Sequence, residues 1–178
     1  MLVRDIESAT LWARDPDKAR SVCARLSERL GIPVTAVDNV ADATADADVI
    51  ITTTPSDEPV LLDTHVRAGQ HITAMGSDAE HKNEIDPRIL KRARYYCDRL
   101  SQVQALGELH HAIDQQLVAA DESFPEIGQV IAGQATARNT ADEITLCDLT
   151  GTGIQDTAIA NLAYRLCQEN QAGTVFNR

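Results

Sequence analysis

The chain has 178 residues, of which 43% are hydrophobic, and this is enough for a single domain with one core. Its formal net charge of -11 and pI near 4.7 argue against a surface for nucleic acid or anionic membrane, because phosphate binding requires clustered lysine and arginine. No apolar run reaches the roughly 18 residues of a membrane span, and Arg4, Asp5 and Glu7 interrupt the segment where a signal peptide would be apolar. We therefore expect a cytoplasmic protein that binds neither nucleic acid nor membrane.

The first third of the chain alternates predicted strands with predicted helices. Residues 9–13 are a short apolar run, which predicts a buried strand. Asp15 can cap the helix that follows, Pro16 suits its first turn, and Gly31 is the expected stop. Strands are then expected at residues 34–37 and 49–53, with a short helix at 40–47. This alternation is typical of a parallel sheet with βαβ crossovers.

The same alternation continues to the end of the chain. Strands are expected at residues 70–75, 94–97 and 144–149, and helices at 87–93, 101–117, 124–132 and 155–169. The predicted fold class is therefore α/β, with a Rossmann-like parallel sheet and flanking helices.

The first βα unit of a Rossmann-like sheet is missing from this pattern. Only eight residues precede the first predicted strand, and they contain no glycine for the turn that holds a dinucleotide pyrophosphate. The first strand of such a fold normally lies in the middle of the sheet, paired on both sides. Its absence predicts two unpaired strand edges inside the domain.

The strand predicted at residues 70–75 ends in a Gly-Ser-Asp turn. Ligands of open α/β sheets bind beyond the carboxyl ends of the strands, so Asp78 is our first candidate for an acid or base. A helix beginning at Ser77 would place Asp78 and Lys82, four residues apart, on one face. The alternative is a solvated ion pair that contributes a few tenths of a kcal/mol.

Two further segments have the position of cofactor-binding elements. Arg14 follows the first predicted strand, where dinucleotide folds meet the adenosine ribose, and an arginine there can pair with the 2′-phosphate of NADP. The adjacent Asp15 leaves NAD as an alternative cofactor, and Arg14 can equally be a surface residue. Residues 151–153 begin a G-x-G-x-x-G pattern but lack its third glycine, because Asp156 stands there. We interpret them as a tight strand-to-helix turn.

The cysteines and histidines predict no metal site. Cys23, Cys97, Cys147 and Cys167 are far apart and lie in apolar patterns, so each is expected to be a buried, reduced thiol. The adjacent His110 and His111 are expected to point in different directions on a helix, which prevents them from chelating one metal.

Five runs of residues closely resemble the ornithine cyclodeaminase/μ-crystallin family, and within it the ectoine-utilisation cyclodeaminase-like branch. They are T-T-T-P-S (52–56), G-Q-H-I-T-A-M-G-S-D-A-E-H-K-N-E (69–84), C-D-R-L-S-Q (97–102), G-E-L-H-H-A (107–112) and D-L-T-G-T-G-I-Q-D-T-A-I-A (148–160). The resemblance implies an NAD- or NADP-linked enzyme that interconverts amino acids and imines, as a cyclodeaminase, an imine reductase or an amino acid dehydrogenase. It also implies a small amino acid or imine as substrate, and a homodimer for a full-length chain.

The resemblance assigns roles to individual residues. Asp78 matches the acidic proton donor and acceptor beside the nicotinamide, and Lys82 matches the lysine that contacts the cofactor. Met75, Gly76 and Ser77 match the loop on the nicotinamide side, Thr54 matches the loop after the preceding strand, and Thr150 matches a position in the substrate pocket.

The resemblance covers the second half of such an enzyme. Residues 1–150 correspond to a partial NAD(P)-binding domain, and residues 151–178 to the C-terminal helix of the substrate and dimerisation domain. The family's substrate-binding residues and its Gly-rich turn belong to a region upstream of Met1, so we expect the chain to be inactive alone. The alternative is a non-catalytic NAD(P)- or ligand-binding module like the crystallins, or an inert gene remnant.

Overall fold

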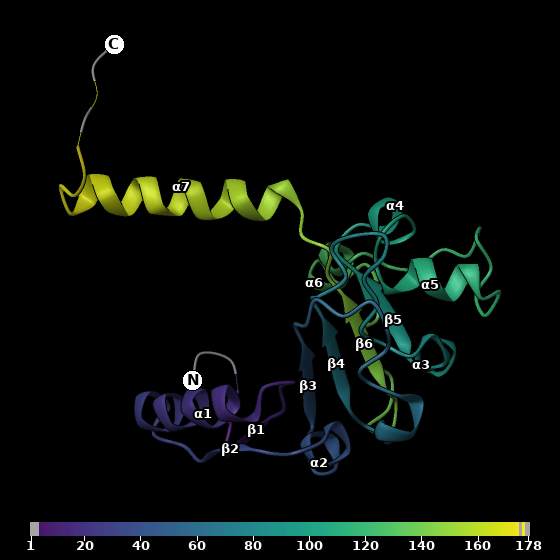
Figure 1. The fold of residues 1–178 in the computed structure, drawn as a ribbon. Coiled ribbons are helices and arrows are strands. Elements are labelled where there is room, and N and C mark those ends of the chain that lie inside the picture. The colour runs from purple at the N-terminus through teal and green to yellow at the C-terminus, as the bar shows by residue number, and fades with distance from the viewer. Residues whose placement is uncertain (1–3, 175, 177–178) are drawn as a thin grey trace.

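The computed structural model describes residues 4–174 and 176, and it has the expected α/β architecture with parallel sheets and flanking helices (Figure 1). The strands are β1 (Ala9–Leu11), β2 (Val34–Ala36), β3 (Val49–Thr52), β4 (His71–Ala74), β5 (Arg94–Cys97) and β6 (Thr145–Asp148). The helices are α1 (Pro16–Leu30), α2 (Val40–Thr44), the 3-10 helix η1 (Asp63–His65), α3 (Pro87–Arg92), α4 (Leu100–Val103), α5 (Glu108–Asp114), α6 (Ile127–Ile131) and α7 (Gly153–Glu169).

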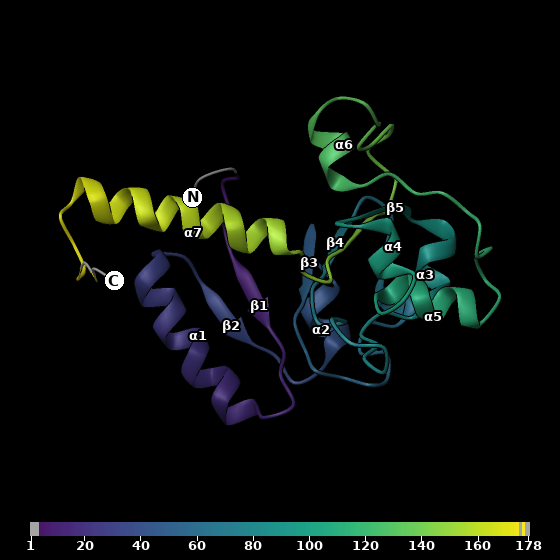
Figure 2. The same cartoon turned by 90° about the horizontal axis from the view of Figure 1, so that it is seen from above.

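The strands form two separate sheets. The larger sheet has the order β3-β4-β6-β5, and all of its neighbouring strands run parallel. The smaller sheet consists of β1 and β2, also parallel. In Figure 2, β1 lies between β2 and the edge of the larger sheet at β3.

The two facing edges are the unpaired edges that the sequence predicts. Among the described residues, β1 pairs with β2 alone and β3 pairs with β4 alone. On β3, Val49 and Ile51 are 46% and 62% exposed, although both are β-branched apolar residues suited to a covered strand. The position between β1 and β3 is the one that a complete Rossmann-like sheet fills with its first strand.

Helix α1 forms for the local reasons that its sequence indicates. The Asp15 side chain accepts hydrogen bonds from the backbone nitrogens of Asp17 and Lys18, and Pro16 occupies the first turn. Gly31 ends the helix with a φ of 69°, in the left-handed region that glycine tolerates. Ala19 and Cys23 are buried on the face toward the small sheet.

The hydrophobic core belongs to the larger sheet. Helices α3 and α5 pack together over it, and both contribute fully buried side chains. The largest of these core side chains are Leu61, Ile72, Ile85, Ile89, Leu109 and Leu146. The core therefore holds β4 and β6, the two central strands, in fixed positions.

The helix predicted at residues 101–117 is wrong, because two short helices, α4 and α5, occupy this region. Gly107 separates them and lies against β6. A Cβ atom at this position would lie 2.7 Å from Oδ2 of Asp148, so the close approach requires glycine. The chain bends there to admit a buried carboxylate that helical periodicity does not reveal.

Helix α7 projects away from the rest of the molecule (Figure 1). All of its residues are exposed, among them the apolar Ile154, Ile159 and Leu162. It also carries Cys167, which is exposed, so the expectation of a buried thiol is wrong at this position. The reason is that the apolar face of α7 meets no other described element. Its assignment to a second domain stays a prediction.

Candidate functional site

The carboxyl ends of the parallel strands bring most of the predicted site residues to one edge of the larger sheet. Thr54 follows β3, residues 75–82 follow β4, and Thr150 follows β6. Because β3, β4 and β6 are neighbours in that order, these three segments are adjacent. The backbone nitrogen of Met75 donates to the carbonyl of Thr52, 3.0 Å away, and so continues the ladder past the strand ends.

Asp78 and Lys82 form the ion pair that their spacing suggests, but not on a helix. The segment is a loop with a turn at residues 80–81, and no helix begins at Ser77. Nζ of Lys82 lies 2.5 Å from Oδ1 of Asp78, and the two side chains are 24% and 57% exposed. The hydrogen bond from Lys82 is the main cause that lowers the pKa of Asp78. Asp78 is therefore a partly exposed, ionised carboxylate held by Lys82.

Glu84 joins the loops that follow β3 and β4. Its Oε1 accepts hydrogen bonds from the backbone nitrogen and the hydroxyl of Thr54, and its Oε2 accepts one from the nitrogen of Gly76 at 2.7 Å. A Cβ at position 76 would overlap both the Thr54 carbonyl and the Glu84 carboxylate. Glycine is thus required at position 76 by the buried side chain beneath it.

Glu108, at the start of α5, accepts hydrogen bonds from the same loop. Its Oε1 accepts from the Ser77 hydroxyl and the Glu84 nitrogen, and its Oε2 accepts from the Asn83 amide and the Ile85 nitrogen. Burial favours the neutral acid and the four donors favour the carboxylate, and the balance raises the pKa of Glu108 to about 7.

Asp148, at the end of β6, is a third buried carboxyl group. Its Oδ2 accepts hydrogen bonds from the Tyr95 hydroxyl at 2.6 Å and from the Leu109 nitrogen at 3.2 Å. Its Oδ1 is buried and has no hydrogen-bond partner among the residues that the structure describes. Burial, and then the charge of Glu108, raise the pKa of Asp148 to about 8.

Thr150 belongs to a neighbouring but separate group of side chains. Its backbone nitrogen donates to Oδ2 of Asp98 at 2.9 Å, and its hydroxyl receives a hydrogen bond from the Gln102 amide at 2.9 Å. Gly151 then turns the chain with a φ of 82°, and α7 begins at Gly153. The prediction of a tight strand-to-helix turn at residues 151–153 is confirmed.

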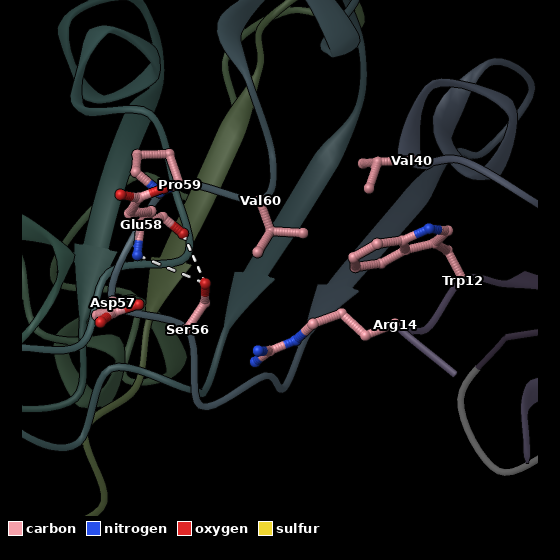
Figure 3. Close-up of a pocket in the computed structure, with 8 residues that line it drawn as sticks. All are labelled: Trp12, Arg14, Val40, Ser56, Asp57, Glu58, Pro59 and Val60. Carbon is pink, nitrogen blue, oxygen red and sulfur yellow. Dashed lines mark hydrogen bonds between the residues drawn. The ribbon is translucent and has the colours of Figure 1, made fainter. Parts of the chain in front are cut away.

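Arg14 does not join the Asp78 group. It is exposed and lines a cavity of about 360 Å³ between the end of β1 and the loop after β3. The cavity is lined by Trp12, Arg14, Val40, Ser56, Asp57, Glu58, Pro59 and Val60. Figure 3 shows the Trp12 ring directed toward Val60 and the Arg14 guanidinium directed toward Ser56.

The side chains that fix the site were not found by sequence reasoning. Glu84, Glu108 and Asp148 are all fully buried, yet none was singled out. Asp148 gives the clearest signal in retrospect, because it interrupts the apolar strand I-T-L-C-D-L, where an unpaired charge would be costly. Glu84 and Glu108 bond mainly to loop backbone, which leaves no periodic pattern.

The histidines act singly. His110 pairs with Asp114 at 3.4 Å, and Nε2 of His111 lies 2.6 Å from the Lys82 carbonyl. Over residues 4–174 and 176, no group of three or more His, Cys, Asp or Glu side chains is placed to hold a metal ion. Within the same residues, no helix is both long and apolar enough to cross a membrane.

Comparison with known proteins gives a family match over almost the whole chain. Residues 1–171 match the Ornithine cyclodeaminase/mu-crystallin family. An uncharacterized cyclodeaminase of Sinorhizobium fredii is 50% identical over 98% of this chain and 53% of its own length. The iminosuccinate reductase of Paracoccus denitrificans is 37% identical over 93% of this chain and 51% of its own length.

A solved structure gives the same result for the fold. An archaeal alanine dehydrogenase dimer with bound NAD superposes with a TM-score of 0.91 and 32% identity, over 98% of this chain and 54% of its own. The chain therefore spans about half the length of the relatives that it matches. The roles of the individual site residues stay predictions.

Proposed function

Since this chain belongs to the ornithine cyclodeaminase/mu-crystallin family, we propose that it forms the nicotinamide side of an enzyme that interconverts an amino acid and its imine with NAD. The observation that carries the proposal is the Asp78–Lys82 pair. It stands at the carboxyl end of the central strand β4, on a loop braced by two buried carboxylates. This is where ligands of open α/β sheets bind.

Asp78 would be the base of the reaction. Bound NAD would supply the acceptor for the hydride that leaves the carbon bearing the amino group. The amino nitrogen loses a proton as the imine forms, and the ionised Asp78 carboxylate accepts it. Lys82 donates a hydrogen bond to the Asp78 carboxylate and would orient it toward the amino nitrogen.

The cavity beside Arg14 fits the adenosine part of a dinucleotide. Trp12, Val40 and Val60 offer an apolar surface for a flat base, and Arg14 stands where a ribose would lie. Asp57 and Glu58 also line this cavity, and their negative charge would repel a 2′-phosphate. We therefore propose NAD rather than NADP, despite the arginine.

Two features support a homodimer with a composite substrate domain. Helix α7 exposes apolar residues along its length, and the alanine dehydrogenase neighbour is a dimer. We propose that residues 151–178 belong to the substrate and dimerisation domain, and that Thr150 lines the substrate pocket at its border. The ectoine-utilisation branch and the cytoplasmic location stay predictions, as does the inactivity of the chain alone.

Binding and turnover test the proposal separately. Trp12 is the single tryptophan of the chain, so titration with NADH or NADPH should quench its fluorescence if the cavity binds the adenosine part. Turnover should be assayed after co-expression with the N-terminal half of the Sinorhizobium relative, by following NADH formation from a panel of amino acids. Saturable quenching without turnover would favour the non-catalytic module, and the absence of both would overturn the proposal.

Asp78→Asn is the decisive variant. Loss of the proton acceptor should lower turnover of the co-expressed enzyme by about 10²–10⁴-fold while NADH binding stays nearly unchanged. Asp121→Asn is the matched control, because Asp121 is exposed and lies in the loop after α5. Retained turnover in Asp78→Asn would remove Asp78 from the mechanism.

A further inference from the structure

One face of α5 is directed at the loop that carries Asp78 and Lys82. Glu108 and His111 are three residues apart, so they lie on the same side of this helix. His110, between them, instead pairs with Asp114. The E-L-H-H sequence thus presents two polar side chains to the loop and directs a third along its own helix.

Glu108 fixes the loop near both of its ends. Through the Ser77 hydroxyl it holds the residue that immediately precedes Asp78. Through the Asn83 amide and the Glu84 and Ile85 nitrogens it holds the residues that follow Lys82. Glu108 is fully buried, and the four donors occupy both of its oxygens, so few other arrangements of the loop would satisfy it.

His111 fixes the backbone of Lys82 itself. A carbonyl oxygen accepts hydrogen bonds and cannot donate them, so the 2.6 Å contact with the Lys82 carbonyl requires a proton on Nε2 of His111. From this anchored backbone the Lys82 side chain extends to Asp78, where its Nζ donates a hydrogen bond to Oδ1. The contacts of α5 therefore bracket the ion pair from both sides.

We propose that Glu108 and His111 are positioning residues, which set the approach of the Lys82 ammonium to the Asp78 carboxylate. The inference rests on the proposed roles of Asp78 and Lys82 at the cofactor side. It goes beyond them because it assigns the geometry of this pair to two side chains of α5. Neither residue needs to touch substrate or cofactor for this role.

Titration of Asp78 by carboxyl ¹³C NMR, on the chain alone and without cofactor, tests the inference. Lys82, and to a lesser extent His81, are the charged groups that lower the pKa of Asp78. In His111→Phe the ring remains but the donor is lost, so Lys82 should withdraw and the pKa of Asp78 should rise toward its ordinary value. His111→Gln supplies an N–H donor near the same position and should keep the pKa low. His110→Phe is the matched control and should leave it unchanged.

Glu108→Ala provides a second, independent arm. It removes both acceptor oxygens that hold the loop, so the loop should be released and the pKa of Asp78 should rise. If this variant does not fold, as judged by circular dichroism, the His111 variants decide alone. An unchanged Asp78 titration in folded His111→Phe would overturn the proposal, and so would an equal rise in His110→Phe or in His111→Gln. Since no cofactor is used, failure of NADH binding would leave this result intact.

Discussion

At the scale of single residues, Gly76 shows how closely the site is fitted to its support. Its nitrogen donates to Oε2 of Glu84 at 2.7 Å, and the space of a Cβ is filled by the Thr54 carbonyl and the Glu84 carboxylate. Gly76→Ala should therefore destabilise the chain by about 1–3 kcal/mol, because the buried carboxylate cannot retreat without losing its donors. Urea unfolding measures the change.

The control for this substitution is Gly128→Ala. Gly128 lies in α6 and no atom is near its ideal Cβ position, so alanine should be neutral or stabilising by up to about 1 kcal/mol. Equal effects of the two substitutions would show that the Gly76 contacts are not a constraint.

The two buried acids make stability depend on pH in the neutral range. Burial raises the pKa of Glu108 to about 7 and that of Asp148 to about 8, whereas both groups titrate near pH 4 when unfolded. Between these values the folded state binds more protons than the unfolded state. The free energy of unfolding should therefore fall as pH rises from about 4 to about 8, by at most about 1.4 kcal/mol per pH unit for each group.

Asp148→Asn separates this effect from a general loss of stability at high pH. The substitution removes the titrating group and keeps an oxygen for the Tyr95 hydroxyl, so the slope above pH 7 should flatten. Denaturant unfolding at several pH values gives the comparison. If the substitution left the slope of the unfolding free energy against pH unchanged, a group other than Asp148 would be responsible for the pH dependence.

Two other acids, Asp86 and Glu143, have lowered pKa values and therefore reduce stability at low pH instead. The Arg88 guanidinium lowers the pKa of Asp86 to about 2, and Arg94 does the same for Glu143. Their stabilising contribution is complete above about pH 4 and is lost as pH falls toward 2. These four acids together should thus make stability greatest near pH 4.

At the residue scale the sequence predicted the reactive pair but not its support. Asp78 and Lys82 were paired by spacing and by the strand-end position, and they do meet, although through a turn. Glu84 and Glu108 were missed, because a hydrogen bond from a distant loop nitrogen has no counterpart in local periodicity. Such contacts, 23–31 residues apart in the chain, follow from tertiary structure alone.

At the scale of elements, the strands were predicted well and the helices between β5 and β6 were not. The strands are short apolar runs with clear breakers, and six of them lie where the pattern places them. The predicted helix at residues 101–117 failed because the chain bends at Gly107, where a Cβ would lie 2.7 Å from Oδ2 of Asp148. Helical spacing alone does not reveal this contact.

The free edge of β3 is the element most exposed to unwanted pairing. Ile51 is 62% exposed on this strand, which pairs with β4 alone among the described residues. An apolar strand with an open edge templates association with other strands. Ile51→Lys should therefore reduce concentration-dependent light scattering by the isolated chain without lowering its melting temperature.

Ile131→Lys is the comparison for this prediction. Ile131 is 80% exposed, but it lies on α6 and not on a strand edge. If both substitutions reduced scattering equally, general surface hydrophobicity rather than the β3 edge would be responsible.

At the scale of the whole molecule, both sheets and α7 expose surface that is suited to burial. Within the residues that the structure describes, the edges of β1 and β3 face each other without a strand between them, and α7 exposes apolar residues (Figure 2). The relatives, of which this chain spans about half, are about twice as long. The sequence predicted the open edges because a parallel sheet has a fixed strand order.

Because α7 is exposed, the cysteine that it carries can be labelled selectively. Cys23, Cys97 and Cys147 are buried, and burial raises the pKa of the last two thiols to about 12, whereas Cys167 is exposed on α7. A maleimide should therefore label the folded chain once, at Cys167, as mass spectrometry of the peptides would show. The rate of labelling at Cys167 reports on assembly, because any partner that covers α7 should slow the reaction of this thiol with maleimide. Rapid labelling of a buried thiol would instead mean that the core opens.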